Sequence, residues 1–421
     1  MANQTIECAS CETSTNTSSA VILLADSFRD QGLQALEKLR CKVVLDAALK
    51  EESLLEAIAN VNPDVLVVRS TKVTKEMLSA SSRLSLVVRA GAGYDTIDVP
   101  AASALGVFVA NCPNKNSVAV AELTWALILS CDRRVPDQVA ELRNGNWDKK
   151  EYAKALGLHG RTLGVVGLGG IGKEVVKRGK AFGMNIVAWS RSLTEEGASE
   201  LGIDRCESIL QLAKISDVVS VHLAATPETE NVINEEFLSA MKEGATFVNT
   251  SRGKVVDECA LAAAVEQKSL LVGLDVYQNE PSSGKSSFLP EIIKHPSVYG
   301  THHVGASTSQ AQDAIAMEAV RVITSYIENG DVPNCVNRAK STPAKAMLCV
   351  RHLNLPGVLA HVFESISQTG VNVEEMENIM YEGAQAACAR IQLSEMPSDE
   401  QIKTISGNNN VLSVTVSTLP E

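Results

Sequence analysis

Three polar side chains with complementary chemistry each follow a short apolar stretch of the chain. They are Arg252, Glu280 and His303. The carboxyl ends of neighbouring parallel strands meet at one edge of a sheet, so we expect these side chains to lie close together. A histidine can accept a hydroxyl proton, a glutamate can orient that base, and an arginine can bind a carboxylate through two parallel hydrogen bonds. The set therefore suits hydride transfer at a 2-hydroxy acid.

A glycine-rich turn indicates where the hydride acceptor would bind. Residues 162–166 form an apolar, β-rich stretch, the pattern G-x-G-x-x-G follows it, and residues 173–182 have the character of a helix. In this strand–turn–helix context the pattern predicts a dinucleotide site, because phosphates bind the free N–H groups at a helix N-terminus. The predicted cofactor-binding residues of the turn are Gly167, Gly169, Gly170, Ile171 and Gly172.

The end of the next predicted strand, residues 185–189, bears on the choice of nicotinamide cofactor. NAD sites usually place an acidic residue there to bind the ribose hydroxyls. This chain has Ser190 and Arg191 instead. An arginine beside a hydroxyl can bind a 2′-phosphate, which makes NADP an alternative to NAD. Arg191 could equally be a solvated cation that stacks on adenine, so the cofactor is written NAD(P).

The elements that must position these residues alternate between apolar strands and amphipathic helices. Such alternation predicts an α/β fold with doubly wound parallel sheets. After about residue 340 the pattern changes to βαββαβ, which indicates a small α+β module. The expected parts are a flavodoxin-like substrate domain of residues 20–117 and 301–333, a Rossmann cofactor domain of residues 118–300, and the module at residues 340–421.

Composition excludes several classes of protein. The 421 residues are 45% hydrophobic and 21% charged, with a formal net charge of −12. This charge argues against nucleic acid or an anionic membrane as the main partner. Residues 1–19 are rich in Ser and Thr and lack Lys and Arg, so we expect a disordered tail rather than a signal or transit peptide. With no apolar run of membrane-spanning length, a cytoplasmic protein is expected.

The ten cysteines show no spacing typical of a disulfide framework or a metal site. Cys8 and Cys11 form a C-x-x-C pair in the polar tail, but no second pair completes a zinc site. We therefore predict no metal and mostly buried, reduced thiols.

On these motifs the chain resembles the D-isomer-specific 2-hydroxyacid dehydrogenases from about residue 21 to the C-terminus. The stretches 68–74, 89–95 and 251–258 carry much of the likeness. The resemblance implies NAD(P)-dependent oxidation of 3-phospho-D-glycerate to 3-phosphohydroxypyruvate, the first step of L-serine biosynthesis. It also implies a homodimer or homotetramer, formed through the long helix that begins near Val118.

The resemblance also assigns roles to single residues. The family usually has proline before its catalytic histidine, whereas this chain has His302, so the choice between the two adjacent histidines stays open. The following Val304 and Gly305 favour His303. The resemblance implies acid–base catalysis for His303, with Glu280 as its partner, and binding of the carboxylate and C2 oxygen for Arg252. It implies contact with the nicotinamide carboxamide for Asp275 and phosphate binding for Arg69. It also implies that the backbone N–H groups of Gly91, Ala92 and Gly93 bind the substrate.

The C-terminal module resembles an ACT regulatory domain. That resemblance implies L-serine as an effector, bound by His352, Asn354 and Asn372. An imidazole and two amides offer donors to a carboxylate and acceptors to an ammonium group. The two asparagines could instead be ordinary turn residues.

Two other functions remain open at this point. The first is an NADPH-dependent glyoxylate or hydroxypyruvate reductase, which Ser190 and Arg191 favour. The second is a non-enzymatic scaffold that senses a dinucleotide, since one fold can carry unrelated functions.

Overall fold

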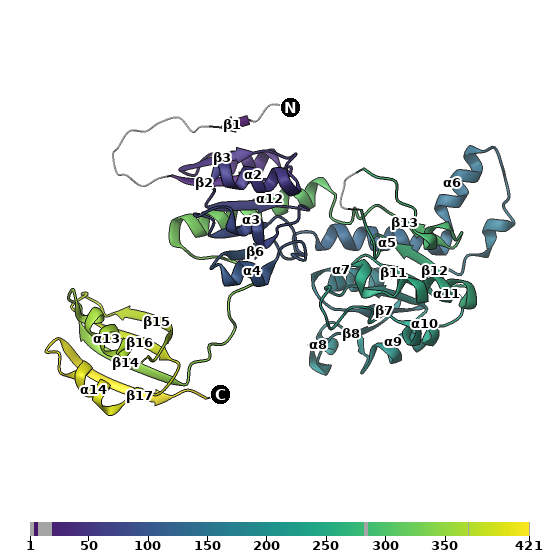
Figure 1. Ribbon diagram of the computed structural model, residues 1–421. Helices are drawn as coiled ribbons and strands as arrows, with labels where there is room; N and C mark the ends of the chain where they lie inside the picture. The colour runs from purple at the N-terminus through teal and green to yellow at the C-terminus, as the bar shows by residue number, and fades with distance from the viewer. Residues whose placement is uncertain (1–3, 7–18, 282–284, 369, 421) are drawn as a thin grey trace. The chain divides into compact units, whose positions relative to one another are not determined.

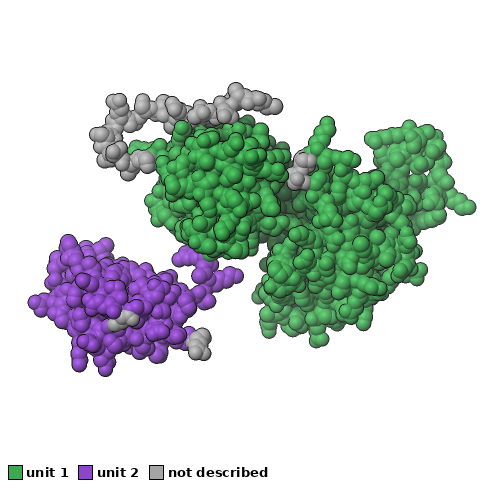
Figure 2. Space-filling view, in the orientation of Figure 1, with its two compact units in different colours: residues 1–337 green, residues 338–421 purple. Residues whose placement is uncertain are grey.

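The computed structural model describes residues 4–6, 19–281, 285–368 and 370–420. The chain divides into two compact units, Met1–Asn337 and Arg338–Glu421 (Figures 1 and 2). The first unit contains two mainly parallel sheets, and the second contains one antiparallel sheet. The predicted α/β fold class with an additional α+β module is confirmed.

The first sheet has the strand order β1-β3-β2-β4-β5-β6, whose parallel part is the flavodoxin-like order. Helices α1 and α12 pack on one face, while α2, α3 and α4 pack on the other. Its strands are β2 (Ala20–Leu24), β3 (Cys41–Leu45), β4 (Val65–Val68), β5 (Leu86–Arg89) and β6 (Phe108–Asn111), and its helices are α1 (Asp30–Leu36), α2 (Glu51–Val61), α3 (Lys75–Ser79), α4 (Val99–Ala104) and α12 (Ser309–Asn329).

Part of the predicted disordered tail is a strand. β1 (Gln4–Ile6) pairs antiparallel with β3, so the prediction is wrong for these three residues. β3 would otherwise be an edge strand, and its free N–H and C=O groups can bind any extended segment that reaches them. The rest of the predicted tail up to residue 18, including Cys8 and Cys11, lies outside the described residues.

The second sheet has the order β13-β12-β11-β10-β7-β8-β9, and every strand pair in it is parallel. Helices α5, α7 and α8 pack on one face, and α9, α10 and α11 pack on the other. The strands are β7 (Thr162–Val166), β8 (Asn185–Trp189), β9 (Asp204–Arg205), β10 (Val218–Val221), β11 (Thr246–Asn249), β12 (Leu271–Leu274) and β13 (Val298–Gly300). The α-helices are α5 (Ser117–Arg133), α7 (Gly170–Ala181), α8 (Glu195–Glu200), α9 (Ile209–Ile215), α10 (Glu235–Ala240) and α11 (Glu258–Lys268), and three 3₁₀ turns are η1 (Glu151–Lys154), η2 (Gly253–Val255) and η3 (Glu291–Lys294).

A further helix, α6 (Val135–Arg143), follows α5 where the sequence analysis recognised only a polar stretch. None of its residues is buried. Figure 1 shows α6 projecting from the end of α5, away from the second sheet. Its apolar residues therefore contribute nothing to the core, which explains why core periodicity did not reveal it.

The second unit is a four-stranded antiparallel sheet in the order β15-β16-β14-β17, with α13 and α14 on one face. Its chain order is βαββαβ, in agreement with an ACT-like module. The elements are β14 (Ala346–Leu353), α13 (Val358–Ser367), β15 (Val373–Met380), β16 (Ala386–Leu393), α14 (Asp399–Ser406) and β17 (Val411–Thr418). Across the described residues of both units, no helix is long and apolar enough to span a membrane.

Candidate active site

His303 and Glu280 form a hydrogen-bonded pair beyond the carboxyl ends of β13 and β12. The Nδ1 atom of His303 lies 2.6 Å from Oε2 of Glu280, and Oε1 of Glu280 accepts the backbone N–H of Tyr277 at 2.9 Å. Both carboxylate oxygens are thus engaged. A carboxylate at Nδ1 selects the tautomer in which Nδ1 carries the proton, so Nε2 is left as the basic atom. The neighbouring His302 is exposed.

The backbone that carries His303 is held in an uncommon conformation. His303 has φ = 54°, in the left-handed region that residues other than glycine rarely adopt. Asp275 is 1% exposed and accepts hydrogen bonds from the Thr301 hydroxyl (2.6 Å) and from the backbone N–H groups of Val304 and Gly305 (both 2.9 Å). These hydrogen bonds fix the loop on both sides of His303 and so hold the His303 backbone in the left-handed conformation.

This setting differs from the role that the resemblance implies for Asp275. All three contacts of its carboxylate are with the histidine loop, and the side chain is buried. Contact with a nicotinamide carboxamide stays a prediction. Within the protein, the observed function of Asp275 is to fix the loop.

Arg252 lies beyond β11, on a loop fixed by Asn249. The side chain of Asn249 accepts the N–H of Ser251 (3.0 Å) and donates to the backbone oxygen of Arg252 (2.9 Å). The Nε and Nη2 atoms of Arg252 donate to Oδ1 of Asp95 at 3.3 and 3.2 Å. Asp95 belongs to the loop after β5, so this ion pair joins the two parallel-sheet domains.

The loop of residues 91–93 presents two of its three predicted N–H groups outward, whereas the N–H of Gly91 donates to the backbone oxygen of Arg89 at 2.7 Å and is not free to bind a substrate. The carbonyl of Gly91 accepts the N–H of Cys112 (2.9 Å), and the carbonyl of Ala92 accepts the side-chain amide of Asn111 (2.6 Å). In a trans peptide the N–H points opposite to the C=O, so the N–H groups of Ala92 and Gly93 point away from these partners. Such paired N–H groups form a site for an anion.

Arg89 is the last residue of β5, and no role was predicted for it from the sequence. Its guanidinium packs directly over Gly91, where a Cβ atom would overlap Nη1, and its buried Nε has no hydrogen-bond partner. Burial, together with the charge of nearby Arg252, lowers the pKa of Arg89 to about 10, so the group stays cationic at neutral pH. Two guanidinium groups, Arg89 and Arg252, therefore flank the 91–93 loop.

Arg69, the predicted phosphate ligand, lies beyond β4 beside a cavity of about 180 Å³ that Arg29, Ala90 and Gln312 also line. The Arg69 loop is fixed by Asp26, whose Oδ2 accepts the backbone N–H groups of residues 69 (2.6 Å), 70 (3.2 Å) and 71 (3.3 Å). Among the described residues the guanidinium of Arg69 has no hydrogen-bond partner, whereas Arg29 is paired with Asp313. Asp26 was not foreseen, because a capping carboxylate far away in sequence leaves no local signal.

The glycine-rich turn joins β7 to α7 as predicted. Gly167 has φ = 100°, and a Cβ there would overlap the backbone oxygen of His222. A Cβ at Gly172 would overlap the Gly167 oxygen, whereas Gly169 faces open space. The first hydrogen bond of α7 runs from Lys173 to Gly169 (3.1 Å), so the N–H groups of residues 170–172 precede it and can bind phosphate. The turn fits a dinucleotide.

Ser190 and Arg191 follow directly after β8, at the same edge of the sheet. Ser190 is half-buried, and Arg191 is exposed without a hydrogen bond or ion pair to any described residue. Arg191 is thus free to bind a group on the adenosine ribose, and the geometry does not choose between the two nicotinamide cofactors.

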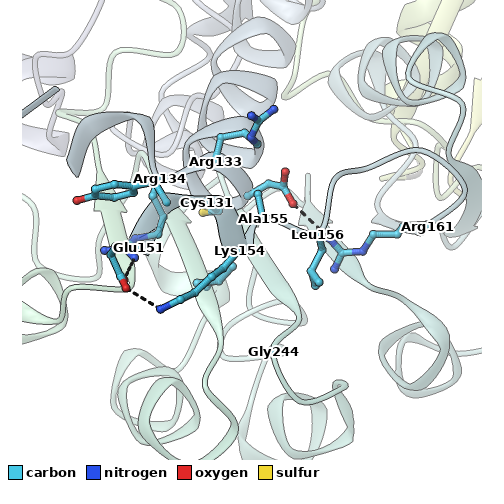
Figure 3. Close-up of a pocket in the computed structure, with 12 residues that line it drawn as sticks. Cys131, Arg133, Arg134, Glu151, Lys154, Ala155, Leu156, Arg161 and Gly244 are labelled. Carbon is cyan, nitrogen blue, oxygen red and sulfur yellow. Dashed lines mark hydrogen bonds and ion pairs between the residues drawn. The ribbon is translucent and has the colours of Figure 1, made fainter. Parts of the chain in front are cut away.

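A larger cavity, of about 300 Å³, lies at the opposite edge of the second sheet (Figure 3). It is lined by Leu271, the first residue of β12, and by Gly244, which precedes β11. Several of its charges pair with one another, as Figure 3 shows for Glu151, which binds Arg134 (2.7 Å) and Lys154 (2.6 Å). Because it lies at the amino ends of the strands, it is separate from the predicted active site.

Within the described part of the second unit, no side-chain hydrogen bond of the three predicted effector residues joins one of them to another. His352 is 2% exposed, and its ring nitrogens lie 2.8 Å from the backbone oxygen of Leu353 and 3.2 Å from Oδ1 of Asn378. The side-chain amide of Asn354 donates to the backbone oxygen of Ala384 (3.0 Å), and that of Asn372 donates to Glu374 (2.9 Å).

Comparison with known proteins agrees with this architecture. A D-3-phosphoglycerate dehydrogenase from Methanocaldococcus jannaschii is 36% identical over 357 residues, which cover 84% of this chain and 66% of the relative. A hydroxypyruvate reductase from Thermotoga maritima is 39% identical over 277 residues, covering 65% of this chain and 88% of the relative. The solved structure of a glyoxylate reductase from Paecilomyes thermophila has a TM-score of 0.68 at 30% identity and covers 76% of this chain and 99% of that structure.

The length of the chain differs from that of many relatives. Against four curated D-3-phosphoglycerate dehydrogenases, the chain spans between 57% and 66% of their length. Residues 125–305 match the model of the D-isomer specific 2-hydroxyacid dehydrogenase, NAD binding domain, so NAD(P) is the cofactor of this part of the chain. These matches, together with the geometry of the site, show that the chain belongs to the D-isomer-specific 2-hydroxyacid dehydrogenase family.

Proposed function

We propose that the chain oxidises 3-phospho-D-glycerate to 3-phosphohydroxypyruvate with NAD(P), the reaction that begins L-serine biosynthesis. The observation that carries this proposal is the unpaired guanidinium of Arg69 beside its own cavity of about 180 Å³. A substrate with one carboxylate needs only the site formed by Arg252 and the 91–93 loop. A second anion-binding group, on the same side of the first sheet, fits a substrate that also carries a phosphate.

The proposed chemistry follows from the geometry. The N–H groups of the 91–93 loop and the guanidinium of Arg252 bind the carboxylate, and Arg252 also polarises the C2 oxygen. Nε2 of His303 accepts the C2 hydroxyl proton while NAD(P)⁺ supplies the acceptor for the hydride from C2. The products are a 2-keto acid, reduced cofactor and an imidazolium. Glu280, 2.6 Å from Nδ1, stabilises that imidazolium, and in the reverse reaction His303 returns the proton.

Charge complementarity supports the phosphorylated substrate. The charges of Arg69 and Arg252 both act on Arg89, and Asp95 is an anion that pairs with Arg252. A monocarboxylate would leave excess positive charge at the site. The phosphate and carboxylate of phosphoglycerate offer one anionic group to Arg69 and another to the cations that flank the 91–93 loop, and electrostatic complementarity of this kind favours both specificity and association rate.

The first test is an initial-rate measurement of reduced-cofactor absorbance. Substrates are 3-phosphoglycerate, phosphohydroxypyruvate, hydroxypyruvate and glyoxylate, each with NAD(H) and NADP(H). Turnover of the phosphorylated pair with a kcat/KM at least tenfold above that for hydroxypyruvate is expected. Turnover restricted to unphosphorylated acids would reject the proposal.

A second candidate, an NADPH-dependent glyoxylate or hydroxypyruvate reductase, is favoured by two observations. Exposed Arg191 replaces the usual ribose-binding acid, and relatives named hydroxypyruvate reductase and glyoxylate reductase are among the similar proteins. The same assay separates the two functions. Tight dinucleotide binding without turnover of any of the four acids would instead support a non-enzymatic scaffold.

We further propose that L-serine acts through the second unit. The support is the ACT-like order of its elements and the positions of His352, Asn354 and Asn372. Because these side chains are hydrogen-bonded to their own neighbours, those hydrogen bonds would have to break before the side chains could bond to serine. Inhibition of phosphoglycerate oxidation by L-serine, absent in His352→Ala, is expected in the same rate assay. D-serine is the matched control ligand.

We also propose that the chain forms a homodimer or a homotetramer. The expected contact was the long helix from Val118, but most of the apolar side chains of α5 are buried within the second sheet's own core. On α6, by contrast, Val135, Val139 and Leu142 are 47%, 38% and 56% exposed and share one helix face. Light scattering coupled to size exclusion is the test, and a mass above the 44.9 kDa of one chain is expected.

A further inference from the structure

Two neighbours, Asp95 and Ser251, hold the guanidinium of Arg252 in place. A guanidinium carries five N–H donors. Arg252 uses Nε and one N–H of Nη2 on Oδ1 of Asp95, and Nη1 donates to the backbone oxygen of Ser251 at 2.7 Å. One N–H therefore remains on each terminal nitrogen, which is enough for a bidentate bond to a carboxylate.

We propose that Asp95 is a positioning residue: it holds the side edge of the Arg252 guanidinium so that the two remaining N–H groups face the substrate carboxylate at the 91–93 loop. This inference rests on the proposed dehydrogenase function, because it assigns the substrate's carboxylate to Arg252.

The close approach at Gly93 supports the inference independently. A Cβ atom at position 93 would overlap Nη2 of Arg252 and would lie 2.9 Å from Oδ1 of Asp95. A residue with a side chain at position 93 would therefore displace the Arg252–Asp95 pair, and only glycine leaves room for it. The guanidinium of Arg252 packs directly against Gly93, which also carries one of the outward N–H groups, so one carboxylate can reach both donors.

The protonation state of Asp95 agrees with this role. Burial raises the pKa of its carboxyl, but the charge and hydrogen bonds of Arg252 outweigh that effect and hold the pKa below its usual value. Arg89 adds a further lowering contribution. Asp95 is thus an anion and an acceptor at neutral pH, whereas a protonated acid would lose part of its capacity to accept from Arg252.

The alternative is that the pair is only a domain-bridging ion pair. Its side chains are 26% and 49% exposed, and such pairs contribute little to stability. The two roles differ in what they predict. Loss of a bridging ion pair would change the unfolding temperature of the chain. Loss of a positioning pair would change substrate binding and turnover through Arg252.

The test compares Asp95→Ala and Asp95→Asn in the full chain, with Glu56→Ala, a change of an exposed side chain on α2, as a control for loss of one surface charge. Asparagine retains an oxygen acceptor for both N–H groups, and alanine does not. Misplacing a binding group by about 1 Å can cost about 100-fold in rate. We expect Asp95→Ala to lower kcat/KM for 3-phosphoglycerate by roughly 10- to 100-fold. Asp95→Asn should stay within about threefold of the parent chain, with the Kd of NADH and the Tm of both variants unchanged.

A second readout does not need turnover. Calorimetric binding of 3-phosphoglycerate to the NADH-loaded chain should weaken in Asp95→Ala, and this loss should vanish in an Arg252→Ala background, because Asp95 acts only through Arg252. Equal effects in both backgrounds, or an Asn variant as damaged as the Ala variant, would overturn the inference. A parent chain that binds 3-phosphoglycerate but turns over no acid would reject the proposed function while leaving this test decisive.

Discussion

Glu280 decides which nitrogen of His303 is available for chemistry. Because its carboxylate is bound both to the Tyr277 N–H and to Nδ1, the imidazole is fixed in orientation and tautomer. A histidine without such a partner would sample both tautomers and rotate. The same two contacts separate His303 from exposed His302, for which no comparable partner is present among the described residues.

Replacing His303 with alanine is expected to lower kcat by about 10²- to 10⁴-fold, the usual contribution of general acid–base catalysis. The measurement is steady-state oxidation of 3-phosphoglycerate. His302→Ala is the matched control and should change kcat less than threefold, since it removes an exposed ring of the same size. If His302→Ala were the more damaging change, His303 would not be the base.

Arg69→Ala should raise the KM for phosphohydroxypyruvate by roughly 10- to 100-fold, because a hydrogen bond to a charged group contributes about 1.5–3 kcal/mol. Hydroxypyruvate has no phosphate, so its KM should change little. The ratio of the two KM values is the readout, and Arg143→Ala on exposed α6 controls for the general loss of a cation. Equal increases for both substrates would assign Arg69 to something other than phosphate.

Arg191→Ala tests the choice of cofactor. The exposed guanidinium can pair with a 2′-phosphate, so its loss should weaken NADP binding by roughly tenfold or more and leave NAD binding nearly unchanged. Dissociation constants from the quenching of protein fluorescence provide the comparison. Equal losses for both cofactors would mean that Arg191 only stacks on the adenine.

Among the structural elements, the loop after β13 depends most on one buried carboxylate. Asp275→Ala would leave the N–H groups of Val304 and Gly305 unsatisfied, at about 1–3 kcal/mol for each buried group. We expect a lower Tm and a larger fall in kcat than in KM, because the loop can then leave the left-handed conformation at His303. Asp275→Asn keeps an oxygen acceptor and should be intermediate. Unchanged kcat in Asp275→Ala would show that the loop needs no such anchor.

The end of β10 carries a group that responds to acid. Burial of the imidazole lowers the pKa of His222 from 6.5 to about 3. The folded state therefore keeps His222 neutral between these values, while the unfolded chain binds a proton below about pH 6.5. The contribution of neutral His222 to the free energy of unfolding is therefore complete above pH 6.5 and decreases as the pH falls towards 3. The Tm measured from pH 7 to 4 should fall less steeply in His222→Asn than in the parent chain, whereas exposed His302→Asn should leave the slope unchanged.

Regular elements were predictable from the sequence wherever apolar periodicity determined them. The strands Thr162–Val166 and Asn185–Trp189 have the predicted bounds. The positions of Arg252, Glu280 and His303 at neighbouring strand ends follow from parallel topology alone. The contacts of Asp26 with the Arg69 loop, of Asp95 with Arg252 and of Asp275 with the His303 loop depend on loop conformations, and no periodicity encodes those. The role of Arg89 depends on its packing over Gly91, which only the folded loop reveals.

At the scale of the whole molecule, the division at Asn337 and Arg338 separates the proposed chemistry from the proposed regulation. Each unit has its own buried core. A chain ending at residue 337 is therefore expected to fold, to keep its kcat within about threefold, and to lose any response to L-serine. Rate assays with and without serine, beside a melting curve of the shortened chain, are the measurement. A serine response that survives the truncation would locate the effector site in the first unit.

The path of the chain after β13 has a mechanical consequence. From β13 it passes through the histidine loop and enters α12, whose Ile315 and Ala319 lie in the core of the first sheet. Asp275 ties the loop as far as Gly305 to the second sheet. Any rotation of one domain on the other would have to bend the chain at residues 306–308 and at the other crossing, between β6 and α5. In such a rotation His303 would move with the dinucleotide turn, and Arg69 and Arg89 would move with the first sheet, so the rotation would change the separation between the anion-binding groups and the proposed base.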